Sequence, residues 1–279
     1  GAMVAWDRFV RRARDPGAPA AVPREILLLS FLGVLLHTPM DWLNVYGARL
    51  WLPFDGAWSY GDAVFIVDPW LWMLLGGAVF LARSGGTALW ASLGAAITAL
   101  MVLGPVPRAA AVVWVAGLAT LVAARRWGRL DEEAARRRVA RLAVLASALY
   151  VALMVSASAL GRSRVEQAAV AAGLKPVDVL VSPEAANPFA AEVEVVTEDG
   201  YVPGELRWLP RTVVTLRPEH QVPFLRSPEG MAPETLASVL EASRAVPDAR
   251  HYLTWARYPH AEVRRSSATW VVRWSDARY

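Results

Sequence analysis

The feature that most constrains this chain is a series of long apolar runs within its first 160 residues. Residues 26–124 carry very few charged side chains, whereas residues 161–279 have the mixture typical of a soluble protein. The whole chain is 55% hydrophobic and 19% charged, against about 25% charged residues in an average soluble domain. This contrast predicts a membrane-embedded part followed by a soluble part.

Five runs come close to the roughly 20 apolar residues that a bilayer core requires. The alternative is a bundle of buried helices in a soluble protein, but the third and fourth runs have no polar face. We therefore expect an all-α membrane region of about five transmembrane helices at residues 26–160, after an N-terminal segment at residues 1–25. The predicted spans are Ile26–Leu43, Ala63–Ala82, Thr87–Gly104, Ala109–Ala124 and Leu142–Leu160.

The placement of arginine predicts how these spans are oriented. Thirteen arginines lie on one side, at residues 8–24, 83 and 125–141, and only Arg49 and Arg108 lie in the short loops of the other side. Because positive loops stay inside, we expect the N-terminal segment in the cytoplasm. The loop Asn44–Asp62 and the C-terminal part would then lie at the outer face of the cytoplasmic membrane. This distribution also explains the net charge of +4 without a nucleic-acid partner, so membrane lipid is the expected partner.

Residues 161–279 predict a soluble α+β domain. Glu198-Asp199-Gly200 is typical of a hairpin turn. Before this domain, Arg125–Arg141 predicts a solvated, charged helical extension. The expected strands are Val177–Val181, Ala191–Thr197, Tyr201–Trp208, Arg211–Leu216 and Ala268–Trp274, and the expected helices are Arg164–Gly173, Pro233–Ala245 and Asp248–Arg257.

The first span ends in polar residues, which is unusual for a simple anchor. His37 and Asp41 are four residues apart, so a helix presents both side chains on one face, with Asn44 nearby. An imidazole and a carboxylate one turn apart can hold a divalent cation. The chain has no cysteine, so any metal must use His, Asp or Glu. The alternative is that His37 and Asp41 only pair with each other at the water boundary.

Two more carboxylates lie near the same predicted membrane face. Asp62 precedes the second predicted span, and Asp68 lies six residues into the run, where a carboxylate needs a cation, a proton or an arginine such as Arg49. We predict that His37 and Asp41 bind a Zn, Mn or Mg ion, although one histidine is few for zinc. Asp62 and Asp68 are the candidate catalytic residues, as further ligands or as a general base. The candidate substrate-binding residues are Asn44, Tyr46 and Arg49.

Several strings resemble those of a known family. HTPMDWLNVYG, LPF and YGDAVFIVDPWLW, and later VSPEAANPF, EDGYVPGE, YLTWARYP and SDARY, are similar to a bacterial and archaeal integral-membrane family of predicted metal-dependent hydrolases. The resemblance implies a metal-dependent hydrolase and carries over to His37, Asp41, Tyr46, Gly47, Asp62 and Asp68. The family also has an upstream His-Arg-Gly-x-x-His-Ser motif, and nothing before His37 matches it. The resemblance therefore implies that the chain is truncated at its N-terminus and lacks part of the metal site.

Three functions remain in competition. His-x-x-x-Asp on a helix is similar to the metal ligands of zinc phospholipases C and related nucleases, which implies a lipid or phosphodiester substrate for the hydrolase. A second hypothesis is a non-enzymatic anchor that presents a binding domain outside the cytoplasm. A third is a small-solute transporter, which Asp68 within an apolar run favours and the absence of a visible sequence repeat disfavours.

Overall fold

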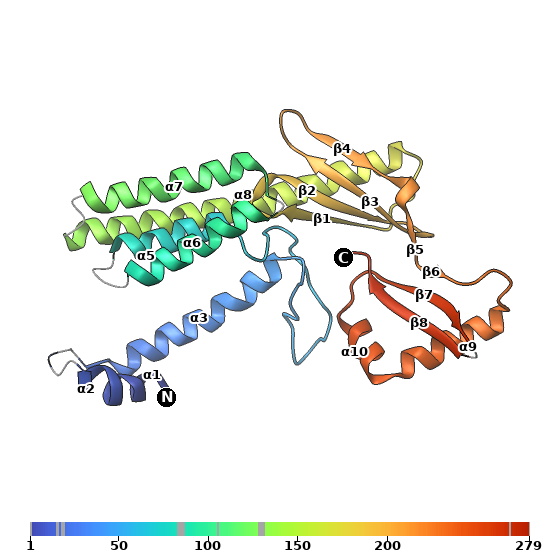
Figure 1. Cartoon of the computed structure of the whole chain (residues 1–279), viewed down its shortest axis with the longest axis horizontal. Coiled ribbons are helices and arrows are strands. Elements are labelled where there is room, and N and C mark those ends of the chain that lie inside the picture. Colours follow the sequence, from blue (N-terminus) through green and yellow to red (C-terminus); the bar gives the residue numbers. More distant parts are fainter. Residues whose placement is uncertain are drawn as a thin grey trace. The chain divides into compact units, whose positions relative to one another are not determined.

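The computed structural model describes residues 2–14, 17, 20–82, 87–104, 106–127, 132–267 and 269–278 (Figure 1). The chain divides into two units, Gly1–Ile66 and Val67–Tyr279. Arg83 and Arg129, which the predicted orientation takes into account, lie outside the described residues.

The N-terminal unit consists of a short helical segment, one long helix and a loop. The short segment comprises α1 (Ala2–Trp6), the π-helix η1 (Asp7–Arg11) and α2 (Arg12–Arg14). Asp7 is buried and accepts a hydrogen bond from the backbone N of Ala21 at 3.1 Å, while it pairs with Arg11 and Arg12. These contacts fasten the short segment to the residues that precede the long helix.

The long helix is α3 (Pro23–Leu43), which confirms the first predicted helix. It begins at a proline, where the missing N–H is not needed, and it continues through Pro39 to its end. Its apolar side chains are exposed, including Leu27, Leu29 and Val34. This is the pattern expected of a helix whose surroundings are lipid rather than protein.

The second unit begins with apolar helices. The first helical stretch consists of α4 (Pro69–Leu71), the π-helix η2 (Trp72–Gly76) and α5 (Gly77–Ala82), and it is followed by α6 (Thr87–Leu103), α7 (Arg108–Trp127) and α8 (Glu133–Ala171). Within the described part of the chain, α3, α7 and α8 are long and apolar enough to cross a membrane, whereas Pro69–Ala82 and Ala88–Leu103 are shorter. Three candidate spans and two shorter apolar helices therefore stand where five spans were predicted.

Two predicted helix boundaries are wrong. The second predicted span starts at Pro69 rather than Ala63, because Asp68 caps the helix that Pro69 begins. The fifth span is not a separate element from the charged extension and the helix Arg164–Gly173. The fifth span, residues 133–141 of the charged extension and residues 164–171 of the predicted helix all belong to the single 39-residue helix α8, which has no proline and only one glycine, Gly161. The first three residues of the extension, 125–127, instead belong to α7, and residues 128–131 lie outside the described residues.

The C-terminal half of α8 packs against the first of two sheets, which confirms an α+β region. The antiparallel order is β1 (Asp178–Glu184), β2 (Asn187–Val196), β3 (Gly200–Arg207) and β4 (Val213–Leu216), and β5 (Val222–Pro223) also pairs with β3. Val165 and Ala169 of α8 form a buried core with valines and Leu206 of the sheet. One continuous helix therefore connects the apolar helices to this core (Figure 1).

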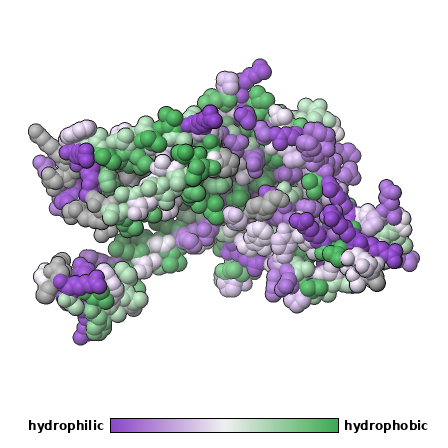
Figure 2. All heavy atoms as spheres, viewed as in Figure 1, coloured by the Kyte–Doolittle hydropathy of each residue, from purple (hydrophilic) through white to green (hydrophobic). Residues whose placement is uncertain are grey.

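The second sheet has the order β6 (Leu225–Arg226), β7 (Pro259–Ser266) and β8 (Thr269–Asp276), after the short helix η3 (Pro218–His220). Two helices, α9 (Pro233–Ala245) and α10 (Pro247–Trp255), precede β7. Strand β7 was not predicted; it begins at Pro259, two residues after the predicted helix Asp248–Arg257, and the first residue of a strand is a position where proline is tolerated. Ala268, the predicted start of the last strand, lies outside the described residues. In Figure 2, hydrophobic residues gather over α5, α6 and α7, and hydrophilic residues gather over the α+β region.

Candidate functional site

Helix α3 presents the predicted metal ligands together near its C-terminal end. His37 Nε2 lies 3.2 Å from Asp41 Oδ2, as the four-residue spacing predicts. The side chains of His37 and Asp41 are 76% and 49% exposed, so both can be reached from outside the protein. The helix thus holds an imidazole and a carboxylate side by side on an open face.

The loop that follows α3 returns to the last turn of that helix. Trp42 Nε1 donates to Ser59 Oγ at 2.9 Å, and Ala48 and Ser59 form an isolated β-bridge. The backbone N of Gly61 donates to the Trp42 carbonyl, and the backbone N of Ala63 donates to the Leu43 carbonyl. The loop is therefore fastened at several points rather than extended from the helix.

Asp62 lies where this loop meets the helix. It stands between Gly61 and Ala63, whose amides bond to Trp42 and Leu43, so its backbone lies beside the turn that also carries Asp41. Its side chain is fully buried, and its φ of 47° lies in the left-handed region. A buried carboxylate on a strained backbone is a frequent feature of functional sites.

The three predicted substrate-binding residues are held by the same loop. Asn44 is buried, and its Oδ1 accepts a hydrogen bond from the backbone N of Tyr46 at 2.8 Å. The guanidinium of Arg49 lies over the Trp58 ring at 4.9 Å. The Nε of Arg49 is buried and has no hydrogen-bond partner among the described residues, so this group can still donate to a ligand. Substrate binding by Asn44, Tyr46 and Arg49 stays a prediction.

Asp68 belongs to the second unit, and its contacts there are structural. Its Oδ1 accepts hydrogen bonds from the backbone N of Trp70 at 2.9 Å and of Leu71 at 3.0 Å. The hydroxyl of Tyr150 on α8 donates to its Oδ2 at 2.7 Å. Asp68 therefore caps a helix and ties it to α8, and its catalytic role stays a prediction.

The residues around α3 fit a metal ion in part. Two ligands that share a tetrahedral ion at about 2.1 Å lie roughly 3.4 Å apart, which matches the 3.2 Å between His37 Nε2 and Asp41 Oδ2. Within the described ranges, no three His, Cys, Asp or Glu side chains come together as a metal site. His37 and Asp41 therefore supply two donors of a site that needs more.

A second group of ionisable residues, which the sequence did not single out as a site, lies in the α+β region. Asp276 is 1% exposed, accepts a hydrogen bond from the backbone N of Arg257 and pairs with Arg278 at 2.8 Å. Burial alone would raise the pKa of Asp276, but the hydrogen bonds and charge of Arg278 outweigh it and lower the pKa below its usual value. Asp276 lies in the final SDARY string, but nothing in its spacing indicates that it would be buried.

Glu194 on β2 is buried close to this carboxylate. Burial, with the negative charges of Asp276 and Glu192, raises the pKa of Glu194 to about 7. Its Oε1 is buried without a hydrogen-bond partner among the residues that the structure describes. Because successive side chains of a strand alternate, Glu194 lies on the face of β2 opposite to Val193 and Val195, which face the α8 core, so the alternation of β2 gives no signal that Glu194 is buried.

A family model described as YdjM inner membrane protein matches residues 2–111, and this family is regarded as one of predicted membrane-bound metal-dependent hydrolases. The match includes all seven residues of the predicted site and ends within α7. The α+β region lies beyond it. No curated protein and no solved structure matches the chain.

Proposed function

We propose that the chain is a membrane-bound, metal-dependent hydrolase that acts at the outer face of the cytoplasmic membrane. The observation that carries this proposal is the His37–Asp41 pair, with its donor atoms 3.2 Å apart on an open face of α3. The similarity of residues 2–111 to a family of predicted membrane-bound metal-dependent hydrolases supports it. A lipid or phosphodiester substrate would suit an enzyme whose helices lie in the bilayer.

Within this proposal, two residues of α3 and two residues of the loop have separate roles. His37 and Asp41 would hold a Zn, Mn or Mg ion, which acidifies a water molecule when it is bound. Asp62 would orient that water or accept its proton from its position beside the last turn of α3. Arg49, held over Trp58 with its Nε buried, would bind an anionic group of the substrate.

Metal content tests this proposal directly. The full chain is purified in detergent, loaded separately with zinc, manganese or magnesium, desalted and analysed for bound metal. We expect about one ion per chain for the preferred metal, and at least a tenfold loss of affinity in His37→Ala and in Asp41→Ala. His220→Ala is the matched control, because His220 is an exposed histidine in the α+β region. Equal metal content in all four proteins would refute the proposal.

Hydrolysis is then measured on the metal-loaded protein. We expect release of product from a chromogenic phosphodiester or a labelled phospholipid, which Asp62→Asn abolishes without removing the metal. If Asp62→Asn keeps the metal but loses turnover, Asp62 acts as a general base and not as a metal ligand. Full activity in Asp62→Asn would exclude its proposed role.

The anchor hypothesis is favoured by one observation, the continuous helix α8. This helix runs from an apolar stretch directly into the core of the α+β region, so it can hold that region at the membrane. As an anchor, the chain would keep its function in a His37→Ala, Asp41→Ala double variant. Reporter fusions at the C-terminus test the shared premise, since both hypotheses place the α+β region outside the cytoplasm.

A further inference from the structure

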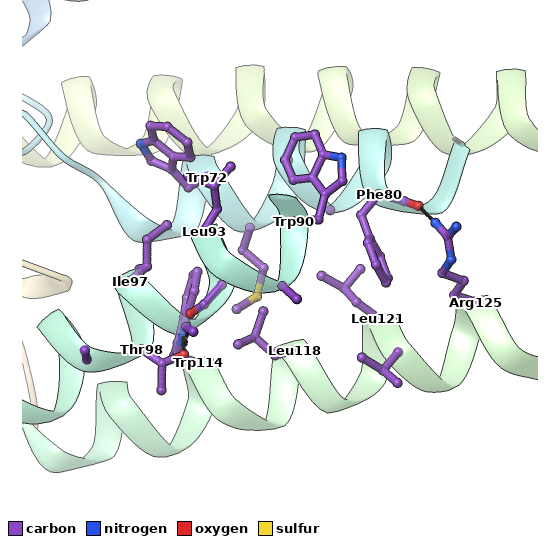
Figure 3. Close-up of a pocket in the computed structure, with 18 of the residues that line it drawn as sticks. Trp72, Phe80, Trp90, Leu93, Ile97, Thr98, Trp114, Leu118, Leu121 and Arg125 are labelled. Carbon is purple, nitrogen blue, oxygen red and sulfur yellow. Dashed lines mark hydrogen bonds between the residues drawn. The ribbon is translucent and has the colours of Figure 1, made fainter. Parts of the chain in front are cut away.

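Helices of the second unit line a partly open cavity of about 1110 Å³. Residues of η2, α5, α6 and α7 contribute its walls (Figure 3). Six of its larger apolar side chains are Trp72, Trp90, Leu93, Ile97, Leu118 and Leu121. Three lining residues, Trp72, Met73 and Gly76, belong to the π-helix η2, and π-turns of this kind often occur at functional sites.

The two ends of this cavity differ in chemistry. At one end Trp114 Nε1 donates to Thr98 Oγ1 at 2.9 Å, and Trp114 packs with Met101 and with Ala186 in the β1–β2 turn. At the other end Arg125 lies over the Phe80 ring at 4.6 Å and donates to the Phe80 carbonyl (Figure 3). The cavity is thus lined by a tryptophan at one end and by cations at the other.

Two arginines stand at the cationic end. Arg125 and Arg126 both line the cavity in the last turn of α7. Neither forms an ion pair with a carboxylate among the residues described by the structure, so their charge is available to an anion from outside. Arginine binds phosphate well because its planar guanidinium can donate two parallel hydrogen bonds.

We propose that this cavity binds an anionic membrane phospholipid, with its acyl chains among the apolar side chains and its phosphate group at Arg125 and Arg126. A cavity lined by such residues does not hold water well, whereas hydrocarbon suits it. Basic pockets between membrane helices are typical sites for anionic headgroups. A soluble phosphate would explain the two arginines but not the long apolar wall. This proposal does not depend on His37, Asp41 or a bound metal.

Lipid binding to the full chain in detergent tests the proposal. Native mass spectrometry is used to titrate phosphatidylglycerol, phosphatidylcholine with the same acyl chains, and inorganic phosphate. We expect a single phosphatidylglycerol per chain, bound about tenfold more tightly than phosphatidylcholine, and no competition from phosphate at millimolar concentration. Equal affinity for the two lipids would refute recognition of an anionic headgroup by the arginines. Full competition by inorganic phosphate would refute a lipid as the ligand.

The apolar part of the site and its charged end can be tested separately, and the apolar part is tested by a variant of Gly94. Gly94 on α6 lines the cavity, and a Cβ added there meets nothing within 4 Å, so Gly94→Phe fills the cavity without a backbone clash. We expect it to weaken binding of both lipids at least tenfold. Its control is Gly33→Phe on α3, where a Cβ also meets nothing within 4 Å. If Gly94→Phe still binds lipid as the wild type does, the cavity is not the lipid site. If Gly94→Phe changes only the oligomeric state, the cavity is instead occupied by a second copy of the chain.

Arg125→Gln with Arg126→Gln tests the headgroup end. We expect the preference for phosphatidylglycerol to disappear while phosphatidylcholine binding persists. Arg136→Gln with Arg138→Gln on α8 is the control, because it removes the same number of charges from another basic stretch. An unchanged preference in the first pair, or an equal loss in both pairs, would refute a role for Arg125 and Arg126. Circular dichroism confirms that each variant keeps its helices.

Discussion

Helix α3 and the α+β region differ in how much of their apolar side chains is exposed. In the α+β region Val195 and Val202 are fully buried between the first sheet and α8. On α3, Leu27 is 73% exposed and Val34 is 72% exposed. The α+β region is therefore stabilised by removal of apolar surface from water. Helix α3 has no such core of its own, and its exposed face is suited to lipid.

The same two regions differ in how they hold charged groups. Asp276 is buried, and its oxygens accept hydrogen bonds from Arg257 and Arg278. His37 and Asp41 are exposed and face each other. The removal of one partner from a buried pair destabilises a fold strongly, because the other partner is left buried without its counter-charge. An exposed pair contributes little to stability and remains free to bind. Four predictions test this difference.

The largest loss of stability is expected from Asp276→Asn. The Arg278 side chain is only 3% exposed, so the substitution leaves a buried cation without its carboxylate. We expect the free energy of unfolding of the α+β region to fall by about 3–5 kcal/mol. A denaturant titration in which unfolding is monitored by hydrogen exchange of the β2 and β8 amides measures this change. Asp248→Asn, at an exposed carboxylate, is the control and should change stability by less than about 0.5 kcal/mol.

Glu194 should make the stability of the same region depend on pH. Its pKa is raised from 4.5 to about 7 in the folded state, so folding favours the protonated form. This contribution is fully present below pH 4.5 and is lost as the pH rises through 7. Between these limits we expect the free energy of unfolding to decrease by about 2–3 kcal/mol. Glu194→Gln should remove most of this dependence, and parallel pH curves for the two proteins would contradict the assignment.

One substitution made at two glycines compares the regions directly. A Cβ at Gly161 on α8 would lie 2.8 Å from Leu206 Cδ2 and 3.3 Å from Val181 Cγ1. Gly161→Leu should therefore overpack the core and reduce stability by about 1–3 kcal/mol. At Gly33 on α3 nothing lies within 4 Å, so Gly33→Leu should stabilise the helix slightly. Thermal unfolding in one detergent checks both, and equal effects would contradict the contrast between the regions.

The helices were largely predictable because each follows an apolar run. The third and fourth predicted spans agree with α6 and α7 to within a few residues. The start of the second was missed although Asp68-Pro69 is a sequence signal for a helix start. The single helix α8 was divided because its composition changes twice along its length, although no residue in it breaks a helix. Hydropathy indicates which part of a chain is suited to lipid and which to water, whereas the ends of a helix depend on its capping residues.

The candidate site was predictable only where one element holds it. The spacing of His37 and Asp41 predicts their contact, because both lie on α3. The return of Asp62 to the last turn of that helix depends on hydrogen bonds of Gly61 and Ala63 to backbone carbonyls, which side-chain identity does not reveal. The link from Asp68 to Tyr150 joins residues 82 positions apart, and no local pattern indicates such a partner.

The smallest effect is expected from His37→Ala. An exposed pair at this spacing contributes about 0.3–0.5 kcal/mol, because water screens both groups, so the variant should unfold almost as the wild type does in metal-free buffer. Thermal unfolding with a chelator present measures this, with Thr38→Ala as a neighbouring control. A loss above about 1 kcal/mol would mean that the pair contributes to the stability of the fold, as Asp276 does in the α+β region. A loss near zero would mean that the fold does not depend on this pair, which leaves binding as its expected role.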